Sequence, residues 1–457
     1  MDVGATSNRQ EGEEPGASPG GLGGFARRSL RRLAGGEAEP PSTVSRLPRF
    51  SVAATEELAD VRPVAGRVHP ERARLALADA LAASQPVTSR ERFAGRSDVL
   101  ADLIAAIEQQ RAHVVLYGER GIGKTSLAHV FAETARDARY LVLYGSCGVE
   151  ASFDDMFRAF AAQIPLLYHA DVSPVADERE HQRSFVELVG PGALDPRQLA
   201  ELFARIVGTR VILILDEYDR VRDPAFRRDV AELIKNLSDR AARVQLVLTG
   251  VASNLDELVG FTPSIRRNIV GLGVGPMADE DMAFILERAE AATGLRFGAD
   301  ARALVLRMAA GSPYLVRLIG SRAALRALDE RRADVTAADV VAGTEAVLSE
   351  WSAGLPARVQ RMLARADVRA DMPILIAAAK ASGTPEGWFA PEDLAGLVRG
   401  IDAGAISGRL EALSGETGLF EAQSDPEDGP RERRYRFRTQ GVAQLLTLSA
   451  ALARADA

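Results

Sequence analysis

A glycine-rich octapeptide, Gly-Glu-Arg-Gly-Ile-Gly-Lys-Thr at residues 118–125, restricts the fold of this chain more than any other feature of the sequence. An apolar run, His113–Tyr117, comes directly before it, and a stretch with helical periodicity, Lys124–Ala135, overlaps its end. Glycine adopts the left-handed backbone that lets consecutive N–H groups turn inward around an anion. The helix that begins near Gly123 adds the positive end of its dipole. The sequence therefore predicts a strand, a phosphate-binding loop and a helix, in this order.

Two side chains of this loop carry specific expectations. Lys124 is expected to reach the β- and γ-phosphates of a nucleotide, and the Thr125 hydroxyl is expected to hold Mg²⁺. The chain has only three lysines, and all its other basic residues are arginine, so a lysine at this position favours a dedicated role. The expected nucleotide-binding residues of the loop are Gly118, Glu119, Arg120, Gly121, Ile122, Gly123, Lys124, Thr125 and Ser126.

A second motif lies in the middle of the chain. The apolar run Val211–Leu215 ends in two adjacent acids, Asp216 and Glu217. Such acids at the end of a buried strand are costly without a cation. We therefore expect Asp216 to bind Mg²⁺ through a water, and Glu217 to act as the general base on an attacking water. The alternative is a pair of strand-end acids that face solvent.

Apolar runs that alternate with helical stretches predict an α/β domain, in which helices cover both faces of a parallel sheet. The expected strands are His113–Tyr117, Tyr140–Tyr144, Val211–Leu215, Val244–Leu248 and a weaker Asn268–Val274. The expected helices are Glu71–Ala83, Ser97–Gln110, Lys124–Ala135, Ser152–Ala162, Pro224–Leu237 and Asn254–Val259. The segment Gln163–Leu194 is ambiguous, and an insertion is one interpretation.

Four regions follow from the pattern along the chain. Residues 1–50 are rich in Gly, Pro, Ser, Glu and Arg and are expected to form a disordered tail. Residues 51–275 hold the α/β core with its N-terminal helices, and residues 276–350 are helical throughout and form a lid. Residues 351–457 have the order helix, helix, helix, hairpin, which is typical of a winged helix. The expected lid helices are Asp279–Thr293, Asp300–Ala309, Pro313–Leu328 and Ala337–Leu348. The expected C-terminal elements are Asp371–Ala381, Pro391–Val398, Ala403–Leu413, Leu419–Gln423 and Arg434–Arg438.

The two motifs, which correspond to Walker A and Walker B, resemble those of the AAA+ and STAND group of P-loop ATPases. The chain is especially similar to bacterial ATPases with an origin-recognition-like (Orc1/Cdc6-like) ATPase domain. Four further segments carry the resemblance: Phe93-Ala94-Gly95-Arg96, Val244–Gly250, Ser264-Ile265-Arg266-Arg267 and Gly311-Ser312-Pro313-Tyr314. The resemblance covers about Pro86 to Leu348 well and the C-terminal domain loosely. It implies ATP and Mg²⁺ as cofactors.

The resemblance also implies roles for residues outside the two motifs. Phe93 and Gly95, followed by Arg96, would lie near the adenine. Thr249 would be the sensor 1 residue at the γ-phosphate, with Asn254 as the alternative.

Three roles depend on other parts of the ATPase. Arg266 or Arg267 would supply an arginine finger to a neighbouring subunit, which requires a nucleotide-dependent homo-oligomer. Pro313, which would begin a helix, would also touch the nucleotide. Arg317, one turn later, is a sensor 2 candidate.

The C-terminal hairpin offers two kinds of partner. In a strand, Tyr435 would point to the core, and Arg434, Arg436 and Arg438 would point outward, where they could lie on DNA phosphates. Residues 351–457 contain about as many acidic as basic residues, and the candidate recognition helix offers mainly Ser407 and Arg409. A protein-contact or autoinhibitory winged helix is therefore favoured over DNA binding.

Composition excludes several classes of protein. The formal net charge of −7 argues against a general binder of polyanions. The single cysteine, Cys147, excludes a disulfide scaffold and suits a reducing compartment. The apolar runs are all far shorter than the roughly 20 residues of a membrane helix. We therefore expect a cytoplasmic protein without a membrane partner.

These features lead to one hypothesis and two alternatives. The hypothesis is a slow ATP-hydrolysing AAA+/STAND-like switch, whose nucleotide state controls assembly or a partner contact. One alternative is an origin-recognition-like, ATP-dependent DNA-binding protein. The other is a nucleotide-dependent scaffold that does not hydrolyse ATP.

Overall fold

The computed structural model describes residues 70–171, 183–252, 255, 263–382, 387–398, 400–415, 418–424, 433–439 and 441–455. The predicted tail, residues 1–50, lies outside the described residues. Asn254 and most of the helix predicted over Asn254–Val259 lie outside them as well. None of the described helices is long and apolar enough to cross a lipid bilayer.

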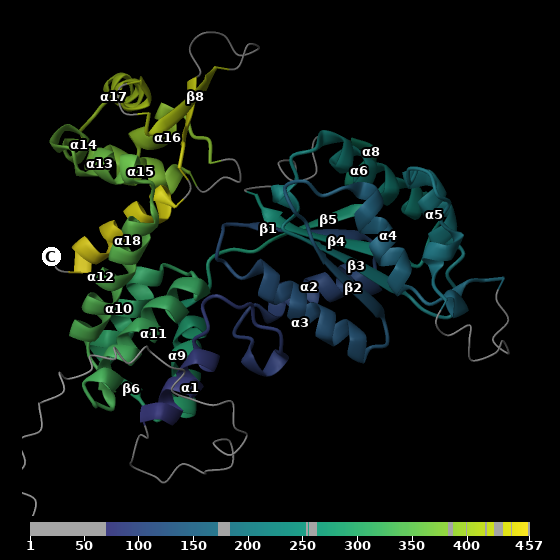
Figure 1. The fold of residues 1–457 in the computed structure, drawn as a ribbon, viewed down its shortest axis with the longest axis horizontal. Helices are drawn as coiled ribbons and strands as arrows, with labels where there is room; N and C mark the ends of the chain where they lie inside the picture. The colour runs from purple at the N-terminus through teal and green to yellow at the C-terminus, as the bar shows by residue number, and fades with distance from the viewer. Residues whose placement is uncertain are drawn as a thin grey trace, which may run out of the picture. The chain divides into compact units, whose positions relative to one another are not determined.

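A five-stranded parallel sheet forms the centre of the α/β core (Figure 1). Its strands are β1 (His113–Gly118), β2 (Leu141–Ser146), β3 (Val211–Asp216), β4 (Val244–Val251) and β5 (Ile269–Gly273). Their order is β2-β3-β4-β1-β5, and every neighbouring pair is parallel. The predicted parallel sheet is therefore confirmed. Because β1 lies between β4 and β5, the loop that leaves its carboxyl end emerges beside the ends of the other inner strands.

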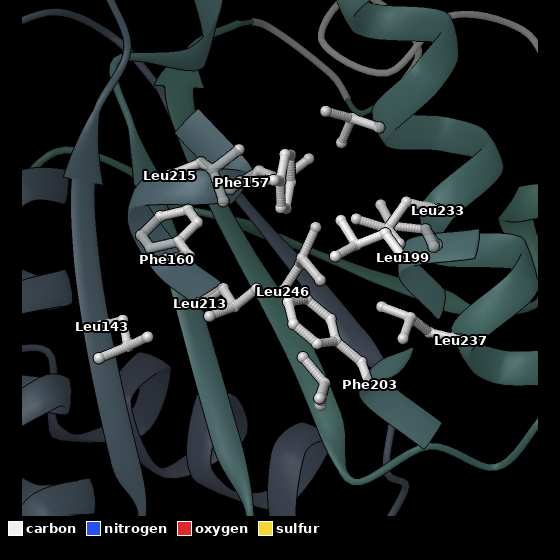
Figure 2. Close-up of a cluster of buried hydrophobic side chains, with 14 of the residues drawn as sticks. Leu143, Phe157, Phe160, Leu199, Phe203, Leu213, Leu215, Leu233, Leu237 and Leu246 are labelled. Atoms are coloured by element: carbon white, nitrogen blue, oxygen red, sulfur yellow. The ribbon is translucent and has the colours of Figure 1, made fainter. Parts of the chain in front are cut away.

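Side chains of β3 alternate between two apolar layers. Leu213 and Leu215 pack against α4 (Phe153–Gln163), α5 (Pro196–Ala204) and α6 (Pro224–Asp239), in the cluster drawn in Figure 2. Ile212 and Ile214 instead join the cluster on the opposite face, with residues of α2 (Ser97–Glu108) and α3 (Lys124–Asp137). The alternation of a strand then directs Asp216 to the α3 face. The core therefore aims the strand-end acid at the helix that follows the glycine-rich loop.

Helix α5 was not predicted, although its sequence carries a helix start. Asp195 accepts hydrogen bonds from the N–H groups of Arg197 and Gln198, and Pro196 occupies the first helical position. Three-residue and four-residue helical turns, η3 (Leu166–Tyr168) and η5 (Phe185–Leu188), precede it. Phe185 and Phe203, both fully buried, join the same apolar cluster as β3. The ambiguous segment thus adds buried side chains to the core.

A second apolar cluster holds the helices of the lid. These are α9 (Asp279–Thr293), α10 (Ala299–Ala309), α11 (Pro313–Asp329) and α12 (Ala337–Gly354), with the short parallel pair β6 (Arg296–Phe297) and β7 (Asp334–Val335). Helix α1 (Pro70–Ala80) belongs to this cluster through Ala73 and Leu77, together with Leu81, the residue that follows the helix. The predicted boundary at residue 276 had placed this helix with the α/β core. It packs on α9 and α11 instead, because its buried residues recur every four positions and form one apolar stripe.

The C-terminal region has its own apolar cluster. Its helices are α13 (Ala357–Ala364), α14 (Ala366–Ala370), α15 (Met372–Ala381), α16 (Pro391–Ala395) and α17 (Ala403–Gly415). The antiparallel hairpin of β8 (Phe420–Ser424) and β9 (Arg433–Phe437) follows them, as the winged-helix layout predicts. A final helix, α18 (Val442–Ala455), was not predicted. It contributes Leu446 to the C-terminal cluster and Leu448 and Leu452 to the lid cluster.

We predict that α5 is required for the stability of the α/β core. Replacing Phe203, which is 0% exposed, by Ala should lower the free energy of unfolding by about 3–5 kcal/mol, because it leaves a cavity behind β3. Chemical denaturation would measure the change. Leu188→Ala, at a side chain that is 44% exposed, is the control and should change stability by less than about 0.5 kcal/mol. Equal stability of the two variants would contradict the packing.

Candidate functional site

The glycine-rich loop wraps around the end of β1 as the motif predicts. Gly118, Gly121 and Gly123 have φ values of 151°, 76° and 100°. A Cβ on Gly118 would lie 2.4 Å from the carbonyl oxygen of Val274, so this position also excludes a side chain by close contact. Helix α3 begins at Lys124, directly after Gly123. The loop therefore presents the start of a fourteen-residue helix, where backbone N–H groups favour an anion.

Lys124 lies inside the loop. Its side chain is 8% exposed, and its Nζ donates to the carbonyl oxygens of Gly118 (2.9 Å) and Glu119 (2.8 Å). Burial lowers the pKa of Lys124 to about 8, while the charges of Asp219 and Asp216 act in the opposite direction. A buried ammonium group whose hydrogen bonds go to backbone carbonyl oxygens is well suited to a phosphate.

The carboxylate of Asp216 is the point where three elements meet. It is 5% exposed. Its Oδ1 accepts hydrogen bonds from the Thr125 hydroxyl on α3 (3.3 Å), the Glu217 N–H (2.9 Å) and the Thr249 hydroxyl on β4. Its Oδ2 accepts one from the hydroxyl of Tyr144 on β2. The two residues predicted to hold Mg²⁺, Thr125 and Asp216, therefore lie in direct contact.

Thr249 is the residue for which the resemblance implies a sensor 1 role. It is 1% exposed and lies two residues before the end of β4, one residue after the pair Leu215–Leu248 that joins β3 to β4. Its hydroxyl faces Asp216 and lies within 3.4 Å of the Glu217 N–H. The alternative, Asn254, lies outside the described residues.

Glu217 has an ionic partner. Its backbone is left-handed (φ 55°), and its side chain is 45% exposed. Its Oε2 accepts hydrogen bonds from Arg220 Nη1 (2.5 Å) and from the Ser146 hydroxyl (3.3 Å). The same oxygen of the Glu217 carboxylate therefore contacts both a guanidinium and a hydroxyl.

Arg96 connects the loop with the start of the lid. The side chain of Arg96 is 9% exposed, and it donates to the carbonyl oxygen of Gly275 (3.0 Å). Burial lowers its pKa to about 10, against the charges of Asp281 and Asp98. A Cβ on Gly95 (φ 63°) would lie 2.2 Å from the Asp281 carboxylate, so glycine at this position lets α9 approach. The Phe93–Arg96 segment is thus packed on the lid as well as on the loop.

The lid reaches the loop through the first turn of α11. The Ser312 hydroxyl donates to the Gly121 carbonyl oxygen (3.3 Å) and accepts from the Leu315 N–H (3.3 Å), so it also caps the helix. Pro313 occupies the first helical position. One turn later, burial and the nearby charges of Arg288 and Arg92 lower the pKa of Arg317.

One cavity of about 1140 Å³ brings these groups together, and it is large enough for a nucleotide. Its lining includes the whole 118–126 loop except Gly118, together with Phe93, Asp216, Glu217, Thr249, Pro313 and Arg317. Loop N–H groups and a lysine can bind phosphate oxygens, and a hydroxyl and a carboxylate can serve as ligands of Mg²⁺. The residues present therefore fit ATP and Mg²⁺.

Arg266 and Arg267 lie away from this cavity. They stand at the end of α8 (Pro263–Arg266) and just before β5, and both are exposed. Arg267 lies 3.9 Å from Asp239. The cavity lining includes neither residue, so a finger role would have to be exerted on another subunit.

Sequence reasoning missed three contacts of the two acids. The three residues Tyr144, Ser146 and Arg220 are not among the site residues that the sequence predicts. Tyr144 and Ser146 stand on β2, which pairs with β3 so that Ser146 faces Asp216. Neither contact follows from the sequence, because the predicted strand Tyr140–Tyr144 ends before Ser146 and the contact of Tyr144 depends on its side-chain rotamer.

Residues 92–249 match the AAA ATPase domain. Over these residues the resemblance to AAA+ P-loop ATPases is therefore confirmed, and the strands and glycine-rich loop of this segment have the AAA+ P-loop fold. Orc1 of Aeropyrum pernix, solved in complex with DNA, is 18% identical over 79% of this chain and 94% of its own (TM-score 0.41). Cdc6p of Pyrobaculum aerophilum is 17% identical over 82% of this chain and 98% of its own (TM-score 0.43). The Holliday junction branch migration motor RuvB of Thermotoga maritima is 18% identical over 79% and 97%, with a TM-score of 0.41. No curated protein matches this chain.

We predict that nucleotide binding depends on Lys124. Lys124→Ala should weaken the binding of ADP by about 100-fold, because a buried charge-assisted contact to the phosphates is lost. A fluorescent ADP analogue would measure the affinity. Lys235→Ala removes an exposed lysine on α6 and should leave the affinity unchanged. Equal affinities of the two variants would remove Lys124 from the site.

Proposed function

We propose that this protein binds ATP with Mg²⁺, hydrolyses it slowly, and uses the nucleotide state as a switch between arrangements of its lid and α/β core. The observation that carries the proposal is the meeting of Lys124, Thr125, Asp216 and Glu217 at the carboxyl ends of β1 and β3. These residue types in one cavity are those of a phosphoryl-transfer site.

The residues of the chain have separate roles in this proposal. Lys124 and the loop N–H groups bind the phosphates, and Thr249 senses the terminal one. Bound Mg²⁺ would neutralise charge on the phosphates, and Thr125 and Asp216 are the residues that would hold it. Glu217 accepts a proton from the attacking water once Arg220 releases its carboxylate.

The switch is supported by contacts between lid and loop. Ser312 of the lid donates to Gly121 of the loop, and Arg96 lies between Gly123, Gly275 and the acid Asp281. A ligand that occupies the loop therefore changes the surroundings of groups that the lid also contacts. Such a ligand biases the lid only if it binds one arrangement more tightly than the other.

The ion pair of Glu217 with Arg220 supports slow hydrolysis. In the described arrangement the proposed base is neutralised by a guanidinium 2.5 Å away. Turnover then requires a rearrangement of this pair before proton transfer. A neighbouring subunit or a protein partner that contacts η6 (Tyr218–Arg220) would supply one.

Glu217→Gln tests the proposal. We expect this variant to keep its affinity for ATP and to lose turnover by about 100- to 10,000-fold, the range that general-base catalysis contributes. Phosphate release would be measured at saturating ATP. Glu232→Gln, an exposed change on α6, is the control and should hydrolyse like the wild type. Unchanged turnover in the Glu217 variant would contradict the base assignment, and a wild type that binds ATP without hydrolysing it would favour the scaffold alternative.

We predict that ATP drives self-assembly if Arg266 or Arg267 acts as a finger. The mass in solution should then rise with a non-hydrolysable ATP analogue, and not with ADP. Replacing both arginines by Ala should lower turnover by at least about 1,000-fold while the analogue still binds. A mass that no nucleotide changes would argue for a monomeric switch and against the finger.

DNA binding remains the less favoured alternative, because several basic residues of the C-terminal region already have partners. Arg409 forms a two-bond ion pair with the buried Asp371, with Nε 2.8 Å from Oδ1. Arg436 bonds Glu421 (2.9 Å) and lies 4.6 Å from the ring of Trp388. Phosphates would have to compete with these contacts, whereas the exposed Arg434 could reach a partner without that competition. A protein contact is therefore the favoured role of this domain.

A further inference from the structure

Tyr144 binds the side of the Asp216 carboxylate that the other donors do not reach. Three hydrogen bonds, from Thr125, Glu217 and Thr249, end on Oδ1. Among the described residues, Tyr144 is the one donor that forms a hydrogen bond with Oδ2. Hydrogen bonds to one oxygen leave the orientation of the carboxylate plane variable, whereas a hydrogen bond to each oxygen restricts it.

The ring of Tyr144 is itself held in place by His129. The two rings stack with centroids 4.4 Å apart and an interplanar angle of 12°. His129 lies on α3, four residues after Thr125, so both project from the same side of that helix. Val142, on the same face of β2, packs in the cluster with Leu127 and Phe131 of α3.

These contacts form a closed circuit. It runs from Thr125 along α3 to His129, across to Tyr144 on β2, and back through Asp216 to Thr125. Thr125 and Asp216, the residues proposed to hold Mg²⁺, are thus also linked through His129 and Tyr144, which are not proposed to bind the ion. Partners of this kind orient metal ligands and strengthen metal binding.

We propose that Tyr144, supported by His129, is a positioning residue that orients the Asp216 carboxylate for the magnesium ion. The inference rests on the proposed function. The proposed role belongs to the Tyr144 hydroxyl, whereas packing beside α3 belongs to the ring. Removing the hydroxyl while keeping the ring therefore separates the two. If Tyr144 only fills space beside α3, the hydroxyl has no effect on metal binding.

Tyr144→Phe separates the two roles. We expect the Mg²⁺ concentration for half-maximal ATP turnover to rise about tenfold, and turnover at saturating Mg²⁺ to stay near that of the wild type. Binding of Mn²⁺ in the presence of ADP, followed by electron paramagnetic resonance, should weaken by the same factor. This second readout does not depend on hydrolysis.

Tyr117→Phe is the matched control. Tyr117 stands on the neighbouring strand β1, and its ring lies against Gly271 and Gly273, outside the cavity lining. It should leave Mn²⁺ affinity unchanged. A Tyr144→Phe variant with the same Mn²⁺ affinity as Tyr117→Phe would overturn the proposal.

Two further variants keep the test decisive if Tyr144→Phe lowers stability. His129→Ala removes the stacked ring and should weaken Mn²⁺ binding in the same direction, while His129→Phe keeps a ring and should restore it. Equal Mn²⁺ affinity of all variants would also overturn the proposal. If the wild type binds no Mn²⁺–ADP and hydrolyses no ATP, the proposed function itself fails. If the wild type does both and Tyr144→Phe changes nothing, only the role of Tyr144 fails.

Discussion

The buried carboxylate of Asp216 is the constraint on which the rest of the core depends. A carboxylate that is 5% exposed needs hydrogen-bond donors, and four converge on it, from α3, β2, β4 and the residue that follows β3. Those donors meet only if the strands lie in their observed order and register. The apolar faces of the sheet hold that register, because a shift of one residue would turn Asp216 from the α3 face to the opposite layer. The packing and the proposed chemistry thus impose the same requirement.

The parts of the fold that the sequence predicts are those with local signals. Each strand of the sheet is a short apolar run with a helix on either side, and the glycine-rich loop fixes which strand starts the fold. Helix α18 was missed because its apolar residues serve two clusters, Leu446 in one and Leu448 in the other, so no single stripe marks it. Helix α1 was assigned to the wrong neighbours because only a contact with α9, distant in sequence, determines where it packs.

The candidate site divides in the same way. Lys124, Thr125 and Asp216 follow from spacing alone, since a motif fixes the backbone that carries them. The partners of the acids do not, because they depend on how side chains meet across strands and turns. Arg220 contacts Glu217 because the backbone of Glu217 is left-handed. A glutamate does not indicate such a backbone in the sequence. Because the chain contains many arginines, the sequence does not indicate which of them pairs with Glu217.

The hydroxyl of Ser312 makes two contacts at once, one within the lid and one with the glycine-rich loop. It closes the first turn of α11 and also bonds the loop at Gly121. From this point α11 continues for 17 residues, about 25 Å, and packs along α12. In the proposed switch, a tilt of α11 at its first turn would give a larger displacement at Asp329, its last residue. The far end of the lid is therefore where a small change in the loop would be easiest to detect.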